Sequence, residues 1–238
     1  MERPDLASPE VRELRRQVAL ACRILYKLGL ADYLGHPSAR IGDGDHVVVK
    51  AGKSVRVRGM AEMGVDQMLI VDLDGRQHLG DDPPPSELSL HLEIYRARPD
   101  VKAVVHTHQL LTTCFGAAGR PILPILHLEG LVVADGLATY PHAHLITSPE
   151  RGRAMAAALG RRAHLHLQGH GIVTTGPTIQ EATLAAVHLE RLAQANYVTL
   201  TLGTPRIIPP GEIAQLREDV AAPDGRWAYY SSLVEEPR

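Results

Sequence analysis

Helical segments alternate with short apolar strands along most of this 238-residue chain, and this alternation restricts its fold more than any other feature. Ser8-Pro9-Glu10 starts an amphipathic helix that is predicted over about 9–28 and is closed by Gly29. The other predicted helices start near Ser86, Ser148 and Thr178, and the predicted strands are 46–50, 68–72, 101–105, 163–168 and 172–174. This alternation predicts the α/β class.

The sequence contains no repeat and no linker-like change in composition. Its length allows one large domain or two small ones, and the uniform composition favours one domain over 1–238. After Gly203, the prolines at 205, 209, 210 and 223 and a final Trp227-Ala228-Tyr229-Tyr230 predict an extended C-terminal tail over 203–238 with an aromatic anchor.

Charge and hydropathy exclude several classes of partner. The chain has 25 Lys plus Arg and 27 Asp plus Glu, with no basic cluster long enough to follow a phosphate backbone. No apolar run approaches the ~20 residues of a membrane span, and the first residues are charged. We therefore expect a cytoplasmic protein that binds neither nucleic acid nor membrane.

Thirteen histidines suggest metal binding, because histidine is the commonest metal ligand. His106 and His108 follow the apolar strand 101–105, and side chains two residues apart on a strand share a face. Open α/β folds tend to bind ligands at strand ends, which favours this pair. The same spacing recurs in His142-Ala143-His144 and His164-Leu165-His166, so spacing alone does not show which of the three pairs binds a metal. We expect structural roles for these four.

Two other residues have contexts that suggest function. His170 lies between Gly169 and Gly171, which let backbone and imidazole approach a neighbour closely; the alternative is a tight turn with an exposed histidine. Glu87 follows three prolines and Ser86 at a helix start, where the helix dipole favours its carboxylate form. The alternative is a first-turn acid without function.

Several segments together resemble the class II aldolase/adducin family. They are Pro85–His91, Ile94–Val101, Ala103–His108 and Gly169–Val173 with Gly176, and the early loop Gly35–Arg40. They occur in the family's order and cover about residues 8–202.

The resemblance implies a single α/β/α domain with a central, mainly antiparallel β-sheet flanked by helices. It also implies a homotetramer with active sites between subunits. One divalent metal ion per subunit would be held by His106, His108 and His170, with Glu87 as the catalytic acid/base. Zinc, manganese, iron and cobalt all suit such ligands. The adducin-like members lose metal ligands that this chain keeps, so an enzyme is expected, and a non-catalytic interaction module is the alternative.

The chain departs from the family's sugar-phosphate aldolases where these bind phosphate. Those enzymes use a Gly-Asn-x-Ser loop, a Thr-x-Ser-Gly segment and a Ser-Ser pair before the catalytic Glu. Here the Asn is His36, the second segment is Lys50–Ser54, and the pair is Pro85-Ser86. Because phosphate recognition needs several convergent donors, a phosphorylated ketose is not the expected substrate.

The altered loop, Gly-His-x-Ser-x-Arg, resembles instead the branch with decarboxylases of hydroxylated aromatic or pyridine dicarboxylates. Arg40 offers a planar fork suited to a carboxylate, and Lys50, Lys53 and Arg56 add positive charge; the alternative for all four is solvated surface charge. The other expected substrate-binding residues are His36, Ser38, Ser86 and, from the tail, Tyr229.

The predicted activity is that of a metal-dependent carbon–carbon lyase, namely a decarboxylase of a small hydroxylated aromatic carboxylate or dicarboxylate. Glu87 is expected to move a proton while the metal stabilises the oxyanion. His127 is expected as a second acid that reaches a neighbouring subunit's site, and simple packing is its alternative. An aldolase or epimerase acting on a sugar or sugar acid is the alternative activity.

Overall fold

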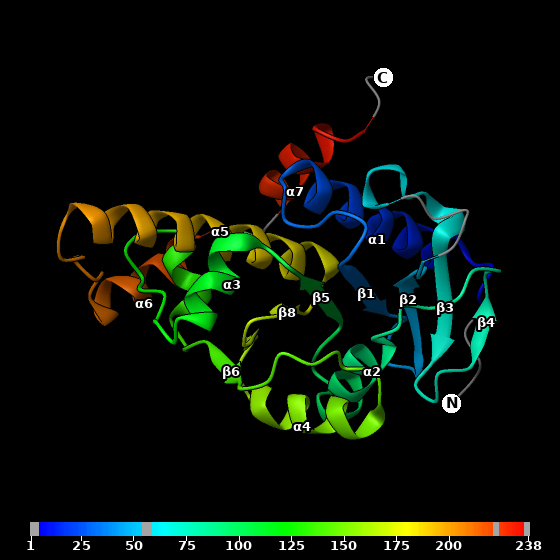
Figure 1. The fold of residues 1–238 in the computed structure, drawn as a ribbon. Helices are drawn as coiled ribbons and strands as arrows, with labels where there is room; N and C mark the ends of the chain where they lie inside the picture. Colours follow the sequence, from blue (N-terminus) through cyan, green and yellow to red (C-terminus); the bar gives the residue numbers. More distant parts are fainter. Residues whose placement is uncertain (1–4, 54–58, 221–223, 236–238) are drawn as a thin grey trace.

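In the described residues, eight strands form one sheet through the middle of the molecule (Figure 1). The computed structural model describes residues 5–53, 59–220 and 224–235. The strands are β1 (His36–Arg40), β2 (His46–Lys50), β3 (Met68–Asp72), β4 (Gln77–Leu79), β5 (Ala103–Thr107), β6 (Ala138–Tyr140), β7 (His164–Leu167) and β8 (Gly171–Gly176). Their order is β4-β3-β2-β1-β5-β8-β7-β6, and only the β6–β7 pair is parallel. The expected mainly antiparallel sheet is confirmed.

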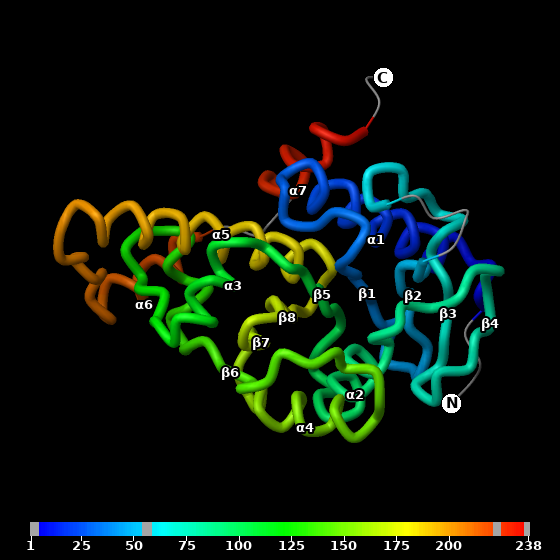
Figure 2. Tube along the Cα trace, in the orientation of Figure 1, coloured from blue at the N-terminus to red at the C-terminus, as the bar shows by residue number. Residues whose placement is uncertain are grey.

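Helices cover both faces of this sheet, as Figures 1 and 2 show. One face carries α1 (Pro9–Lys27), α3 (Leu110–Ala117) and α5 (Ile179–Leu202), and the other carries α2 (Leu88–Ala97) and α4 (Pro149–Leu159). The described residues also form the short 3₁₀ helices η1 (Met60–Glu62), η2 (Val65–Gln67) and η3 (Glu129–Val133). The α/β/α arrangement is therefore confirmed.

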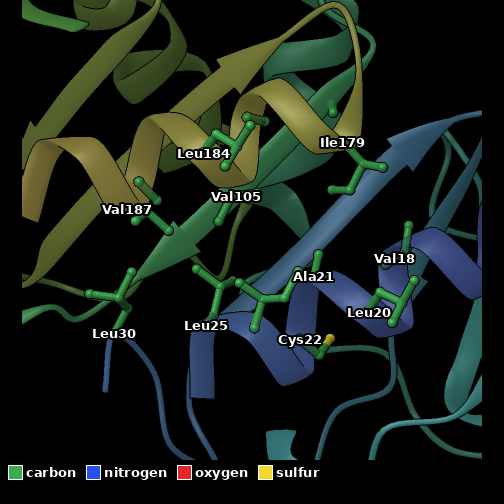
Figure 3. Close-up of a cluster of buried hydrophobic side chains, with 14 of the residues drawn as sticks. Val18, Leu20, Ala21, Cys22, Leu25, Leu30, Val105, Ile179, Leu184 and Val187 are labelled. Atoms are coloured by element: carbon green, nitrogen blue, oxygen red, sulfur yellow. The ribbon is translucent and has the colours of Figure 1, made fainter. Parts of the chain in front are cut away.

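Strand alternation divides the buried apolar residues into two layers. Val48 and Val105 face α1 and α5, whereas Val47, Val49 and Val104 face α2 and α4. Figure 3 shows Val105 of β5 among side chains of α1 and α5. Strands β2 and β5 thus have apolar side chains in both layers, which fixes their register.

The helix starts follow the capping residues. The side chains of Ser8, Ser148 and Thr178 each accept a hydrogen bond from a backbone N–H in the first turn of α1, α4 and α5. The helix expected near Ser86 begins slightly later, with Glu87 as the residue before its first turn. The expected elements around the site are therefore present.

Two expectations were wrong. The tail beyond Gly203 contains α6 (Pro210–Asp219) and α7 (Asp224–Ser232) rather than extended chain. The prolines at 209 and 210 lie at the start of α6, where a missing backbone N–H costs no helical hydrogen bond. Trp227 and Tyr230 are buried, so the aromatic anchor is confirmed. The segment 36–40, which resembled a loop, is strand β1, because it pairs with both β2 and β5.

Candidate metal centre and substrate pocket

The end of β5 positions the first two histidines. Strand alternation turns His106 toward the α2 side of the sheet, opposite His36 of β1. The buried His106 donates its Nδ1–H to the backbone oxygen of Ile172 over 2.8 Å, because a carbonyl oxygen can only accept. This leaves the Nε2 lone pair free, 2.9 Å from Nε2 of His108. Such a hydrogen bond on the far nitrogen orients metal-ligating histidines.

The turn between β7 and β8 brings in His170. A Cβ on Gly171 would lie 2.3 Å from the backbone oxygen of Thr107, so only glycine allows the turn to approach β5 this closely. The His170 ring lies 5.0 Å from the rings of both His106 and His108, centroid to centroid. Gly171 therefore serves a close approach, as expected of the glycines that flank His170.

Glu87 completes the cluster from the start of α2. Its Oε1 accepts the backbone N–H of Ile146 over 2.7 Å, while Oε2 lies 3.7 Å from His106 Nε2 and 3.6 Å from His170 Nε2. Burial by itself raises the pKa of the Glu87 carboxyl, but the His170, His36 and His106 imidazoles and the Ile146 N–H together lower it below its usual range. Glu87 is therefore a carboxylate at neutral pH.

The four groups suit a divalent metal ion. One nitrogen or oxygen atom from each of Glu87, His106, His108 and His170 lies within 4.8 Å of the others. Burial lowers the pKa of His106 well below its usual value and that of His108 to about 4. Neutral imidazole is the metal-binding form. Neither buried ring nitrogen of His170 has a hydrogen-bond partner in the described part of the chain, and a metal would satisfy one of the two.

The rival histidine pairs lie elsewhere. His142 and His144 stack on each other beside Tyr140, and His164 and His166 are buried in β7. Across residues 5–53, 59–220 and 224–235, the Glu87 cluster is the only group of three or more potential ligands that lie close enough to hold a metal.

A pocket of about 220 Å³ opens beside the cluster. Glu87, His36, His108 and Ser86 line it, and the Ser86 side chain is exposed. The remaining lining residues are Tyr33, Leu34, Gly35, Lys50, Gly52, Lys53, Pro85 and Leu145. The structure thus brings together the metal cluster and two of the expected substrate-binding residues.

Two lysines give the pocket positive charge. Lys50 is buried at the end of β2 and donates to the backbone oxygen of Ala51 over 3.1 Å. Burial, followed by the charge of Lys53, lowers the pKa of Lys50. Lys53 lies 4.8 Å from the centroid of the Tyr33 ring. A Cβ on Gly52 would lie 2.4 Å from the backbone oxygen of Pro84, so glycine lets the triproline loop close the pocket beside these lysines.

Ser38 and Arg40 are not among the described residues that line this pocket. The Ser38 hydroxyl is buried between His91 and Tyr95. The Arg40 guanidinium donates to the backbone oxygens of Gly44 and Tyr95 and lies 5.0 Å from the Tyr95 ring centroid. The Arg40 guanidinium, which was expected to bind a substrate carboxylate, thus donates to backbone oxygens instead. Its bond to Tyr95 joins β1 to α2.

The remaining expected residues lie apart from the pocket within this chain. His127 is exposed in the turn before η3, and Tyr229 is 60% exposed on α7. Ser54 and Arg56 lie outside the described residues.

Sequence reasoning missed His91, whose Nε2 lies 2.7 Å from Nδ1 of His36. A weak signal was available, because His91 and Tyr95 are four residues apart on the predicted helix and therefore share a face. Tyr33 was also missed, and no pattern in the sequence distinguishes it.

Comparison with known proteins supports the expected family and class of activity. Residues 16–197 match the class II aldolase and adducin N-terminal domain family. The chain is 35% identical to 3,4-dihydroxyphthalate decarboxylase of Arthrobacter keyseri, with 85% of each chain covered. It is 33% identical to the protein of that name from Terrabacter sp., covering 83% of this chain and 86% of the relative. It is 32% identical to 5-methylthioribulose-1-phosphate/5-deoxyribulose-1-phosphate aldolase of Rhodospirillum rubrum, covering 86% and 90%.

Solved structures support the fold. L-fuculose 1-phosphate aldolase from Glaciozyma antarctica matches with a TM-score of 0.81 over 98% of this chain and 94% of that one, at 21% identity. An aldolase II superfamily protein from Pseudomonas syringae matches with a TM-score of 0.80 over 97% and 95%, at 23% identity. Sequence, fold and cluster agree, and the chain belongs to the class II aldolase and adducin family.

Proposed function

We propose that this protein is a metal-dependent decarboxylase of a small hydroxylated aromatic carboxylate, and that 3,4-dihydroxyphthalate represents its substrate class. The observation that carries the proposal is the position of Lys50 and Lys53 in the pocket beside the Glu87 cluster. Cationic side chains attract a dianionic ring, and the relatives named as dihydroxyphthalate decarboxylases support the same choice.

The metal would be held by His106, His108 and His170, with Glu87 as an occasional fourth ligand, and it would supply Lewis acidity for the developing oxyanion. Zinc, manganese, iron and cobalt are all compatible with these ligands. Lys50 and Lys53 hold the substrate carboxylate, and Ser86 donates a hydrogen bond from the rim of the pocket.

The ionised state of Glu87 sets the order of proton transfers. As a carboxylate it first accepts a proton at Oε2 from a substrate hydroxyl. It then returns that proton to the ring carbon as the carbon–carbon bond to the carboxylate breaks and carbon dioxide leaves. Oε1 remains bound to the Ile146 N–H, which keeps Oε2 directed at the pocket.

The test measures isotopically labelled carbon dioxide released from carboxyl-labelled 3,4-dihydroxyphthalate under nitrogen. The protein is first reconstituted with Mn²⁺, Zn²⁺, Fe²⁺ or Co²⁺. We expect metal-dependent release that disappears in His106→Ala and persists in His142→Ala, a control outside the cluster. Protein that binds metal stoichiometrically but releases no carbon dioxide from this or related dihydroxy dicarboxylates would contradict the proposal.

Aldol cleavage is the second candidate, because an aldolase of Rhodospirillum rubrum is 32% identical to the chain. An assay for aldehyde product with sugars, sugar acids and ketose phosphates tests it. The four residues of the cluster are all present, which argues against a non-catalytic adducin-like module. If none of the four metals binds the protein stoichiometrically, such a module would be favoured.

We also propose a homotetramer in the cytoplasm, with active sites between subunits to which His127 and Tyr229 contribute. Exposed apolar side chains near the end of α5, including Tyr197, Val198 and Leu202, support an interface between copies. Sedimentation velocity tests the assembly and cell fractionation tests the location. A monomer with full activity would contradict the shared sites.

A further inference from the structure

A buried chain of hydrogen bonds lies directly behind the pocket and has no part in the mechanism above. The Tyr95 hydroxyl lies 2.8 Å from Ser38 Oγ, which lies 2.7 Å from His91 Nδ1. Nε2 of His91 lies 2.7 Å from Nδ1 of His36. All four residues are at most 7% exposed, so water does not compete for these contacts.

Two regular elements build this chain. His36 and Ser38 are two residues apart on β1 and therefore face the same side of the sheet. His91 and Tyr95 are four residues apart on α2 and face β1 together. The β1–β5 register also places His36 opposite the metal-site residue His106. The hydrogen-bond chain thus connects the buried interface between β1 and α2 with the candidate metal site.

The end of the hydrogen-bond chain at His36 determines where the hydrogens of the whole hydrogen-bond chain lie. Nε2 of His36 faces Oε2 of Glu87 across 3.9 Å, and a carboxylate can only accept. A hydrogen on His36 Nε2 is therefore favoured over a lone pair that would face negative charge. Nδ1 of His36 must then accept from His91, whose Nδ1 accepts from the Ser38 hydroxyl. Ser38 Oγ in turn accepts from the Tyr95 hydroxyl.

We propose that His91, Ser38 and Tyr95 are positioning residues that hold His36 in the tautomer with its hydrogen on Nε2, so that His36 presents a fixed N–H to substrate in the pocket. His36 lines the pocket, whereas the three positioning residues do not touch it. A donor oriented before the substrate binds needs no reorganisation during the reaction. The substrate's identity rests on the proposed function, but the tautomer does not.

The first test needs no substrate. In ¹⁵N-histidine NMR spectra of the Zn²⁺-loaded protein, His36 is assigned by the signals lost in His36→Gln. We expect the wild type to show hydrogen on Nε2 alone. His91→Phe removes the donor to Nδ1 and keeps an aromatic ring, so we expect a mixture of His36 tautomers. The control His188→Phe, another buried histidine outside the network, leaves the His36 signals unchanged.

The second test uses turnover. We expect kcat to fall about 10- to 100-fold in His91→Phe, which is typical when a supporting hydrogen bond is removed, with zinc content unchanged. His91→Gln should recover part of kcat, because its amide can donate to His36 and accept from Ser38. Ser38→Ala should lower kcat less than His91→Phe does, and Tyr95→Phe should lower it less again. These two variants replace His91→Phe if that variant does not fold.

An unchanged His36 tautomer in folded His91→Phe, or in Ser38→Ala if that variant must replace it, would overturn the proposal. So would His91→Gln activity no higher than that of His91→Phe. If the wild type shows the expected tautomer but releases no carbon dioxide, the proposed function fails while the positioning role stands. The two ideas are therefore tested separately.

Discussion

At the scale of single residues, hydrogen-bond partners determine what each histidine can do. His106 donates to a backbone oxygen, which leaves its other nitrogen for a metal. His91 has partners on both nitrogens, so it can orient a neighbour but cannot bind a ligand. His142 is exposed and stacked on His144. Residue type alone therefore does not predict the role of a histidine. The hydrogen-bond partners of its two ring nitrogens do.

Glu87→Gln tests proton transfer at the site. Glutamine can still accept the Ile146 N–H at its oxygen, but it cannot take or return a proton. We expect kcat to fall by about 10² to 10⁴, the usual contribution of a general acid or base, in a carbon dioxide release assay. Metal content measured by mass spectrometry should stay near that of the wild type. Activity equal to that of the wild type would exclude the assigned role.

Lys50→Met tests the charge in the pocket. Methionine keeps the length and apolar packing of the buried stem but removes the cation that we propose binds the substrate carboxylate. We expect KM to rise about 10- to 100-fold, since a charged hydrogen bond contributes ~1.5 to 3 kcal/mol, with a smaller change in kcat. Lys27→Met, at the exposed end of α1, is the matched control. Equal KM values for the two variants would show that Lys50 does not bind the substrate.

The sequence predicted the cluster better than the pocket. His106, His108, His170 and Glu87 lie in segments with the family's spacing, and the structure brings them together. The fate of Arg40 was not predictable, because its partners are backbone oxygens of Gly44 and Tyr95 that meet it only in the folded chain. Hydrogen bonds between distant elements leave no local pattern in a sequence.

At the scale of elements, caps and apolar periodicity predicted most helices and strands. The prediction of an extended tail was wrong, because prolines that disfavour a helix interior also suit a helix start. Only packing distinguishes the two cases. Strand β1 was missed because polar His36, Ser38 and Arg40 face α2 rather than solvent. A strand with a polar but buried face lacks the usual alternation of apolar and polar residues.

Gly171→Ala tests how the β7–β8 turn supports the metal site. The added methyl would lie 2.3 Å from the Thr107 backbone oxygen and 2.9 Å from the His108 ring. We expect the turn to move away from β5, which would weaken metal affinity about 10-fold or more in a chelator competition assay. Gly211→Ala in α6 is the control, since a Cβ there meets nothing within 4 Å in the described part of the chain. Similar affinities in both variants would contradict this account.

At the scale of the whole molecule, one sheet joins the metal site to apolar layers on both faces. None of the helices in the described ranges has the length and hydropathy needed to cross a membrane. The single domain expected over 1–238 stays a prediction. Several histidines lie within these layers away from the pocket, and burial lowers the pKa of His164, His166 and His188 from 6.5 to about 4. These residues link global stability to pH independently of catalysis.

The sign of this linkage follows from the number of protons that each state binds. Between pH 6.5 and about 4, the unfolded chain protonates these histidines and the folded chain does not, so the free energy of unfolding falls as the pH falls. One unit of pKa difference corresponds to about 1.4 kcal/mol, so each histidine contributes a loss on the order of 1–3 kcal/mol. We expect denaturant melts of metal-free protein to show constant stability above pH 7 and a steep loss toward pH 4.5. His164→Phe should reduce that slope, whereas replacement of exposed His142 by Phe should not. An unchanged slope in His164→Phe would show that His164 titrates alike in both states, and that acid unfolding begins elsewhere.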